Sequence, residues 1–133
     1  MSYLLDTDIC IYILNAKDPN LQKRFREHAV EGLSVSALTE AELYFGALRS
    51  TSPAQNRERI QLLLDPITII PFDSTAAHHF AEIKLALAQQ GRPTGAMDLL
   101  IAATAKAYNF TLVTNNVRHF QNIPNLAVEN WTA

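Results

Sequence analysis

The sequence contains a single cysteine, Cys10, so no disulfide bond can form within the chain. Cys10 lies in an apolar segment, where a thiol usually packs as a small hydrophobic side chain. This composition excludes a small domain held together by disulfides, and it is consistent with a reducing compartment.

Long apolar runs are also missing. No segment reaches the roughly 18 apolar residues that span a bilayer. The amino terminus lacks the basic segment, apolar stretch and small-residue cleavage site of a signal peptide. We therefore expect no membrane contact and a cytoplasmic location.

Neither sign of charge is in large excess, and the formal net charge is −2. Proteins that hold nucleic acid by overall charge are usually strongly basic, so any nucleic-acid contact must be local. The basic residues that do cluster are Lys17, Lys23, Arg24, Arg26, Arg57 and Arg59. A solvated helix face is the favoured interpretation of these clusters.

The 133 residues are 48% hydrophobic and 18% charged, without a repeat or a low-complexity segment. This length and composition predict one globular domain over residues 1–133. Short apolar segments predict strands at 3–5, 33–35, 67–72, 111–114 and 126–128. Apolar spacing, prolines and capping residues predict helices at 7–15, 19–29, 37–48, 53–64, 74–90 and 97–107, with a loop at 91–95. The expected capping residues are Thr7 or Asp6, Asp18, Ser36, Ser52 and Asp73. Such alternation predicts a three-layer α/β/α fold with a mainly parallel sheet of four or five strands.

Three acidic residues stand at informative positions in this pattern. Asp6 ends the first strand, and Glu42 and Asp98 lie near the starts of two helices. Asp6 and Asp98 can equally act as helix-capping or first-turn acids. Glu42 shares a helix face with apolar neighbours, but Glu40 also looks partly buried, so periodicity leaves the choice between the two glutamates open.

The expected fold brings strand ends and helix starts to one edge of the sheet, so Asp6, Asp98 and the segment after Thr114 should converge there. Carboxylates packed together need a cation to remain ionised, and oxygen ligands favour hard ions such as Mg²⁺ or Mn²⁺. The pattern therefore predicts a divalent metal site.

Four segments in order resemble the motifs of VapC toxins, which are PIN-domain ribonucleases. They occupy residues 4–7, 36–46, 91–103 and 113–120 and read LLDT, SALTEAELYFG, GRPTGAMDLLIAA and VTNNVRHF. The resemblance implies a toxin of a toxin–antitoxin pair, an Mg²⁺- or Mn²⁺-dependent endoribonuclease that a VapB-type antitoxin neutralises. It implies an RNA substrate, with a tRNA and specifically the initiator tRNA as candidates, and a homodimer within a toxin–antitoxin hetero-oligomer.

The resemblance selects Glu42 over Glu40 and implies Asp6, Glu42 and Asp98 as metal and catalytic residues, with Asn116 as a fourth catalytic position. Many relatives have aspartate at the position of Asn116, where an amide oxygen contributes no charge. Asp8 stands where asparagine is usual in this type of VapC. It either adds charge to the site or supports the first helix.

Three other classes of protein share parts of this pattern. A receiver domain shares the length and alternation, with Asp73 as its phosphate acceptor, but the lysine expected after a late strand is missing. A haloacid-dehalogenase phosphatase shares only the acids of the first motif. Asn116 suggests a non-catalytic PIN-like module that binds RNA. The three retained acids argue against this alternative.

Overall fold

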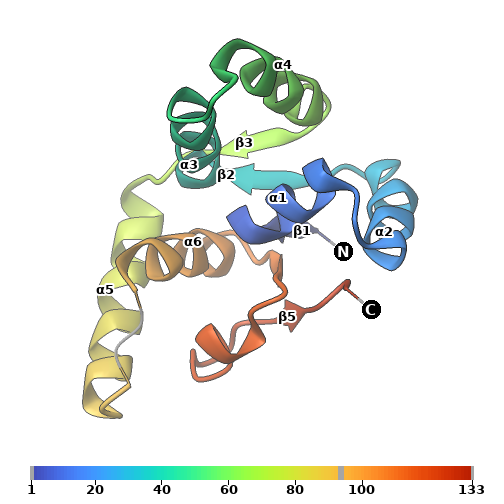
Figure 1. Ribbon diagram of the computed structural model, residues 1–133. Coiled ribbons are helices and arrows are strands. Elements are labelled where there is room, and N and C mark those ends of the chain that lie inside the picture. Colours follow the sequence, from blue (N-terminus) through green and yellow to red (C-terminus); the bar gives the residue numbers. More distant parts are fainter. Residues whose placement is uncertain (1, 93–94, 133) are drawn as a thin grey trace.

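The computed structural model describes residues 2–92 and 95–132 and contains one five-stranded parallel sheet (Figure 1). Its spatial order is β3-β2-β1-β4-β5. The strands are β1 (Tyr3–Leu5), β2 (Ser34–Ser36), β3 (Thr68–Ile70), β4 (Thr111–Val113) and β5 (Val128–Glu129). The predicted α/β class with a parallel sheet is confirmed.

Helices connect consecutive strands in pairs. The connections are α1 (Thr7–Asn15) and α2 (Pro19–Ala29), α3 (Ala37–Leu48) and α4 (Pro53–Leu64), and α5 (Ser74–Gln89) and α6 (Ala96–Ala107). A short 3₁₀ helix, η1 (Val117–His119), follows β4. Residues 93 and 94 of the predicted loop lie outside the described residues.

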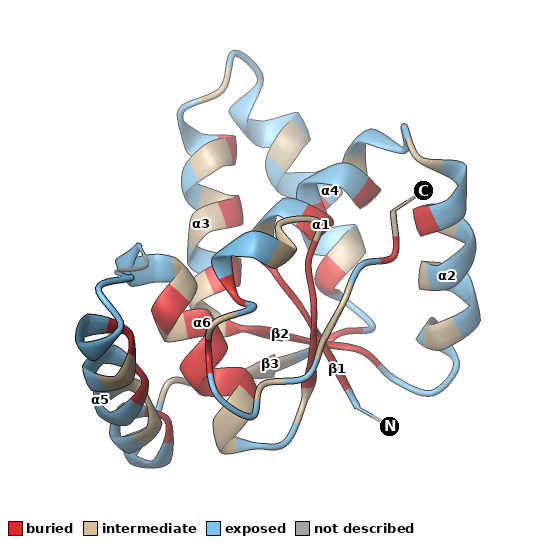
Figure 2. Ribbon diagram, turned by 90° about the horizontal axis from the view of Figure 1, so that it is seen from below, coloured by how far each residue is buried: buried red, intermediate tan, exposed pale blue. Residues whose placement is uncertain are grey.

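The sheet separates two apolar cores because side chains alternate along each strand. Leu5 and Val113 face a core built with α1 to α4, whereas Leu4 and Leu112 face a core built with α5 and α6. Figure 2 shows α6 buried at the centre of the second core, with α5 outside it. The molecule is therefore a three-layer α/β/α sandwich.

Most of the predicted helix caps form. Side chains of Asp6, Asp18, Ser36 and Asp73 accept hydrogen bonds from backbone amides in the first turns of α1, α2, α3 and α5. The prediction that Ser52 caps α4 was wrong. Its backbone (φ −134°, ψ 68°) is not the extended conformation usual at this position, and its side chain makes no capping hydrogen bond.

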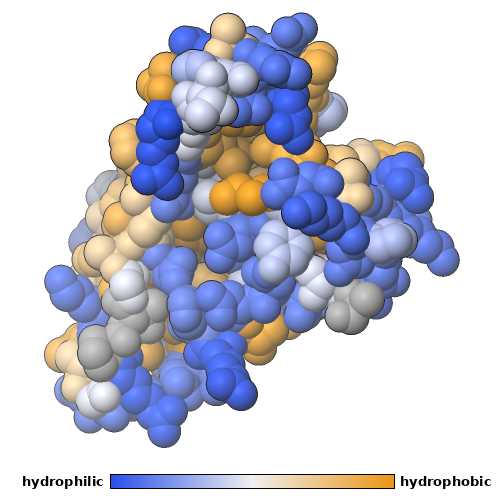
Figure 3. Space-filling view, viewed as in Figure 1, coloured by the Kyte–Doolittle hydropathy of each residue, from blue (hydrophilic) through white to orange (hydrophobic). Residues whose placement is uncertain are grey.

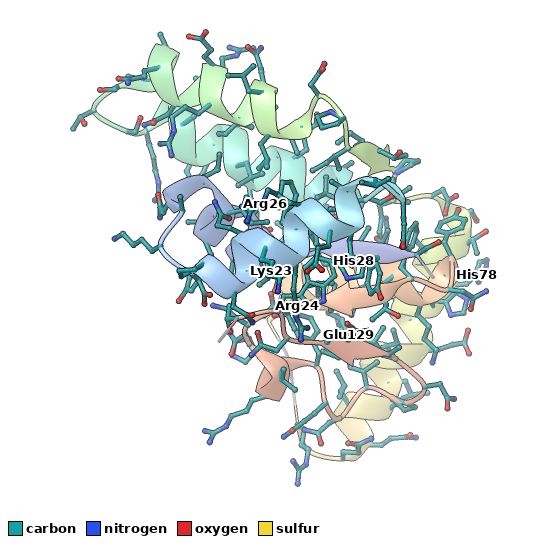
Figure 4. The ribbon with its side chains drawn as sticks, turned by 90° about the vertical axis from the view of Figure 1, so that its right-hand side faces the viewer. Lys23, Arg24, Arg26, His28, His78 and Glu129 are labelled. Atoms are coloured by element: carbon teal, nitrogen blue, oxygen red, sulfur yellow. The ribbon has the colours of Figure 1, made fainter. Side chains whose placement is uncertain are left out.

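The surface of α2 agrees with a further expectation. Lys23, Arg24 and Arg26 are exposed along α2, as predicted for a solvated helix face (Figure 4). Within residues 2–92 and 95–132, no helix is long and apolar enough to cross a membrane.

The register of the central strands determines which residues meet at the carboxyl edge. Leu5 of β1 pairs with Val35 of β2 on one side and Val113 of β4 on the other. The backbone therefore leaves the sheet at three adjacent places, which carry Asp6, Ser36 and Thr114.

Candidate active site

Asp6 is the most buried acid at the carboxyl edge, with a relative exposure of 5%. Its Oδ1 accepts the amide hydrogen of Ile9 at 2.8 Å, which makes Asp6 the N-cap of α1. Its carboxylate also accepts a hydrogen bond from the Thr114 side chain at the end of β4. Capping and a place in the site, which sequence reasoning treated as alternatives, therefore coincide in one side chain.

The electrostatic setting of Asp6 is unfavourable for its negative charge. Burial, with smaller contributions from the charges of Asp8 and Asp98, outweighs the lowering effect of the hydrogen bonds from Thr114 and Ile9 and raises the pKa of Asp6 from its ordinary value of 3.8 to about 6. A nearby cation would remove this cost. Asp8 itself is exposed in the first turn of α1 and adds negative charge near the site.

Asp98 lies in the first turn of α6, close enough to Asp6 for the two charges to interact. Its Oδ2 is 2.8 Å from Nδ1 of His119, and Nδ2 of Asn116 is 3.1 Å from the same ring nitrogen. Nδ1 donates to Asp98 only when it carries a proton, and it accepts from Asn116 only when it does not. The two contacts of His119 therefore exclude each other.

Glu42 of α3 contacts the first residue of α1. The Thr7 hydroxyl donates to Oε1 of Glu42 at 2.5 Å, and Thr7 is next to Asp6 in the chain. The structure thus links Glu42 to the same helix start that carries Asp6. This contact supports the choice of Glu42 over Glu40, which sequence periodicity left open.

The described residues contain no group of three or more histidine, cysteine, aspartate or glutamate side chains close enough to hold a metal ion. The donor chemistry nevertheless suits a hard divalent cation, because carboxylate and amide oxygens surround the edge. Oδ1 of Asn115 is buried there without a hydrogen-bond partner. A buried carboxylate with a raised pKa and an unpaired buried oxygen are both sites that a cation stabilises.

The sequence pattern places the segment after Thr114 at this edge but assigns no role there to Thr7, Thr114 or His119. It predicts Thr7 only as a possible cap and Thr114 only as a strand residue. The spacing of His119 from Asn116, three residues, was the available signal, because one helical turn brings such side chains together.

The receiver-domain alternative predicted that Asp73 is a free phosphate acceptor. Asp73 instead caps α5 through the amide of Ala76, and its other carboxylate oxygen accepts a hydrogen bond from the Tyr108 hydroxyl. It follows β3, at the outer edge of the sheet, whereas Asp6 and Asp98 meet beside the central strand. This arrangement does not favour a receiver domain.

Comparison with known proteins assigns the class. The model of the PIN domain family matches residues 3–126, and the chain belongs to this family. Within it, the chain is similar over nearly its whole length to proteins named VapC. Ribonuclease VapC2 of Rickettsia felis is 38% identical over 136 residues, covering 98% of both chains. The tRNA(fMet)-specific endonuclease VapC of Shigella flexneri is 34% identical, covering 99% of both chains.

Solved structures agree in fold. VapBC2 from Rickettsia felis, bound to a DNA fragment from its promoter, superposes with a TM-score of 0.93 at 36% identity and covers 98% of this chain and 99% of that chain. DNA-bound VapBC from Salmonella typhimurium superposes with a TM-score of 0.93 at 31% identity and covers 98% of both. The arrangement of the carboxyl edge is thus carried by a fold that VapC proteins share.

Proposed function

We propose that this protein is the toxin of a VapBC-type pair and acts as a metal-dependent endoribonuclease that hydrolyses RNA phosphodiester bonds. The observation that carries the proposal is the approach of Asp6 and Asp98 at the carboxyl edge of a chain that is similar to VapC ribonucleases over nearly its whole length. Glu42 belongs to the same site through Thr7.

The metal would be Mg²⁺ or Mn²⁺, held by Asp6 and Asp98. Mg²⁺ commonly uses one or two carboxylates and keeps several waters, which suits a site with two close acids rather than three. When bound, such an ion polarises the phosphoryl oxygen and lowers the pKa of a bound water. Asn116 and Asn115 supply neutral oxygens and amide hydrogens around the acids.

The remaining roles belong to side chains of this chain. Glu42 orients the attacking water with the carboxylate oxygen that Thr7 does not occupy. Thr114 and the amide of Ile9 fix the rotamer of Asp6, and His119 fixes that of Asp98. Hydrolysis would leave a 5′-phosphate on one product and a 3′-hydroxyl on the other.

Substitution of Asp98 tests the site. Asp98→Asn keeps the shape but removes the charge, and we expect RNA cleavage to fall ~100-fold or more. Glu82→Gln, an exposed carboxylate on α5, is the matched control and should cleave at the parental rate. An Asp98→Asn protein that cuts RNA at the parental rate would show that the site is wrongly assigned.

A tRNA is the proposed substrate, because the Shigella flexneri relative is named as specific for tRNA(fMet). Mapping of new 5′-phosphate ends in cellular RNA after brief induction tests this assignment. We expect the ends to concentrate in the initiator tRNA. Ends spread over messenger RNA, with intact tRNA, would contradict the proposed substrate.

An antitoxin of the VapB type is the proposed partner, and an apolar groove of about 190 Å³ next to Glu42 fits it. Figure 3 shows this hollow below α4. Its apolar lining consists of Ile11, Leu14, Leu43, Ala47 and Ile60 from α1, α3 and α4. A partner segment with an apolar face can fill the groove, and an arginine or lysine beside it can pair with the site acids and displace the metal.

Coexpression with the neighbouring small open reading frame should restore growth of cells that express this protein. Ile11→Lys should weaken binding of that partner at least ~10-fold, because it places a charge in the groove. Leu85→Lys on the distant face of α5 is the control. If no neighbouring product ever restores growth, the partner proposal fails.

A further inference from the structure

Three buried or partly buried hydroxyl groups connect α1 and α3 next to Glu42. The Thr7 and Thr39 hydroxyl oxygens are 3.0 Å apart, and those of Ser36 and Thr39 are 3.3 Å apart. Ser36 and Thr39 have a relative exposure of 0%. Thr7 also contacts Glu42, so the four side chains form one connected chain of hydrogen bonds.

The direction of each hydrogen bond follows from the chemistry of the groups. A carboxylate only accepts, and a hydroxyl has one proton, so Thr7 donates to Glu42 and has no proton left for Thr39. Thr39 must therefore donate to Thr7. Ser36 then donates to Thr39, and its own oxygen accepts the amide hydrogen of Thr39 at 3.0 Å.

We propose that Ser36, Thr39 and Thr7 form a directed hydroxyl chain whose role is to position the Glu42 carboxylate for the reaction. This inference rests on the proposed ribonuclease function. Hydrogen bonds that point the same way polarise one another, so the contact between Thr7 and Glu42 is stronger than an isolated one. Oε1 of Glu42 is held by Thr7, which leaves Oε2 to face a water.

Burial of the hydroxyl chain makes its hydrogen bonds costly to break. A buried hydroxyl without a partner costs free energy, so Thr39 cannot turn away from Thr7 without loss. Ser36 caps α3, which carries Glu42, and Thr7 begins α1, which follows Asp6. The hydroxyl chain therefore also fixes these two helices relative to each other. Thr7 and Thr39 are thus positioning residues for Glu42.

Kinetics on the full-length protein test the roles of the two threonine hydroxyls. Thr39→Val and Thr7→Val remove only the hydroxyl, and we expect kcat on RNA to fall ~10–100-fold while KM changes less than about threefold. Thr39→Ser and Thr7→Ser restore the donor and should recover most of kcat. Thr104→Val is the matched control for Thr39→Val, because Thr104 is as buried as Thr39 but donates to the carbonyl of Leu100 within α6.

Two combinations with Glu42 separate positioning from a general effect on folding. In a Glu42→Ala background, Thr39→Val should lower kcat no further. In metal-free protein without RNA, the loss in Tm of the Thr7→Val/Glu42→Gln double variant should be less than the sum of the two single losses, because both change one interaction.

The outcomes distinguish this inference from the proposed function. If the parental protein cleaves RNA and both valine variants keep the parental kcat, or if serine fails to restore it, the positioning role is overturned. Additive effects in the Glu42→Ala background overturn it as well. If the parental protein does not cleave RNA in the presence of Mn²⁺, the proposed function fails, and the Tm comparison still tests the hydroxyl chain by itself.

Discussion

Burial raises the pKa of Asp6 and of Cys10, which are both buried ionisable side chains at the start of α1. Cys10 is completely buried, and burial together with the charge of Asp6 raises the pKa of its thiol. Burial keeps reagents away from Cys10, and the raised pKa disfavours the thiolate, which is the reactive form of cysteine. Asp6 is nearly as buried, but the hydrogen bonds from Thr114 and the Ile9 amide stabilise its carboxylate and lower its pKa against the effect of burial.

We therefore expect Cys10 to resist alkylation in the native protein. Iodoacetamide at pH 8 should label it at least ~100-fold more slowly than it labels the protein in urea. Mass spectrometry of samples quenched over time measures both rates. Equal rates in the two conditions would show that Cys10 is accessible.

The raised pKa of Asp6 predicts how stability depends on pH in metal-free protein. The unfolded chain loses this proton near pH 3.8 and the folded chain near pH 6, so the folded state binds more protons between these values. Its unfolding free energy should therefore fall as pH rises from 4 to 6 and stay lower above, by about 3 kcal/mol from this group.

Urea unfolding in EDTA at pH 4, 5.5 and 7 measures this dependence. Asp6→Asn should remove the fall that Asp6 causes, because the amide does not ionise. Asp65→Asn, an exposed carboxyl at the end of α4, should leave the pH dependence unchanged. A parental dependence that survives in Asp6→Asn would assign it to other groups.

At the scale of elements, α5 shows how an outer helix packs by one face only, here against α6. Ile83 has a relative exposure of 2% and packs in the core with α6, whereas Leu85 on the same helix has a relative exposure of 60%. Hydrophobicity alone does not distinguish the two residues. Their position relative to α6 does.

Matched truncations of α5 test this difference. Ile83→Ala should lower the unfolding free energy by about 2–5 kcal/mol through lost burial and the cavity left behind. Leu85→Ala should change it by less than about 0.5 kcal/mol. Urea unfolding of the two variants at one pH provides the comparison, and a similar loss in both would mean that Leu85 is covered in solution.

At the scale of the whole molecule, the site depends on segments that are distant in the chain. Asp6, Asp98 and the loop after β4 approach only because α6 is packed centrally against the sheet (Figure 2). Folding therefore assembles mutually repelling carboxylates, and a bound cation should stabilise the folded state over the unfolded chain.

We expect Mn²⁺ at about 100 times its Kd to raise the Tm by about 5–10 °C. The double variant Asp6→Asn/Asp98→Asn should lose this shift because the proposed ligands no longer carry charge. Differential scanning calorimetry with and without Mn²⁺ measures it. An equal shift in the double variant would place the metal elsewhere.

The sequence by itself determined the elements and their order. Strand 3–5, the helices that follow Asp6, Asp18 and Ser36, and the parallel class are set by periodicity and capping, which act over a few residues. Ser52 does not form the expected cap, because its backbone (φ −134°, ψ 68°) departs from the extended conformation of a capping residue. The approach of Asp6 to Asp98 followed from the topology of parallel sheets, a rule that is general enough to apply without coordinates.

Only the tertiary structure decided which side chains share a hydrogen bond at that edge. Thr7 and Thr39 are 32 residues apart, and His119 and Asp98 are 21 residues apart, so no local pattern relates them. Their pairing depends on the rotation and depth of α1, α3, α6 and η1 against the sheet, to within about one ångström. Sequence patterns specify which face of a helix is apolar, but packing in three dimensions sets that rotation.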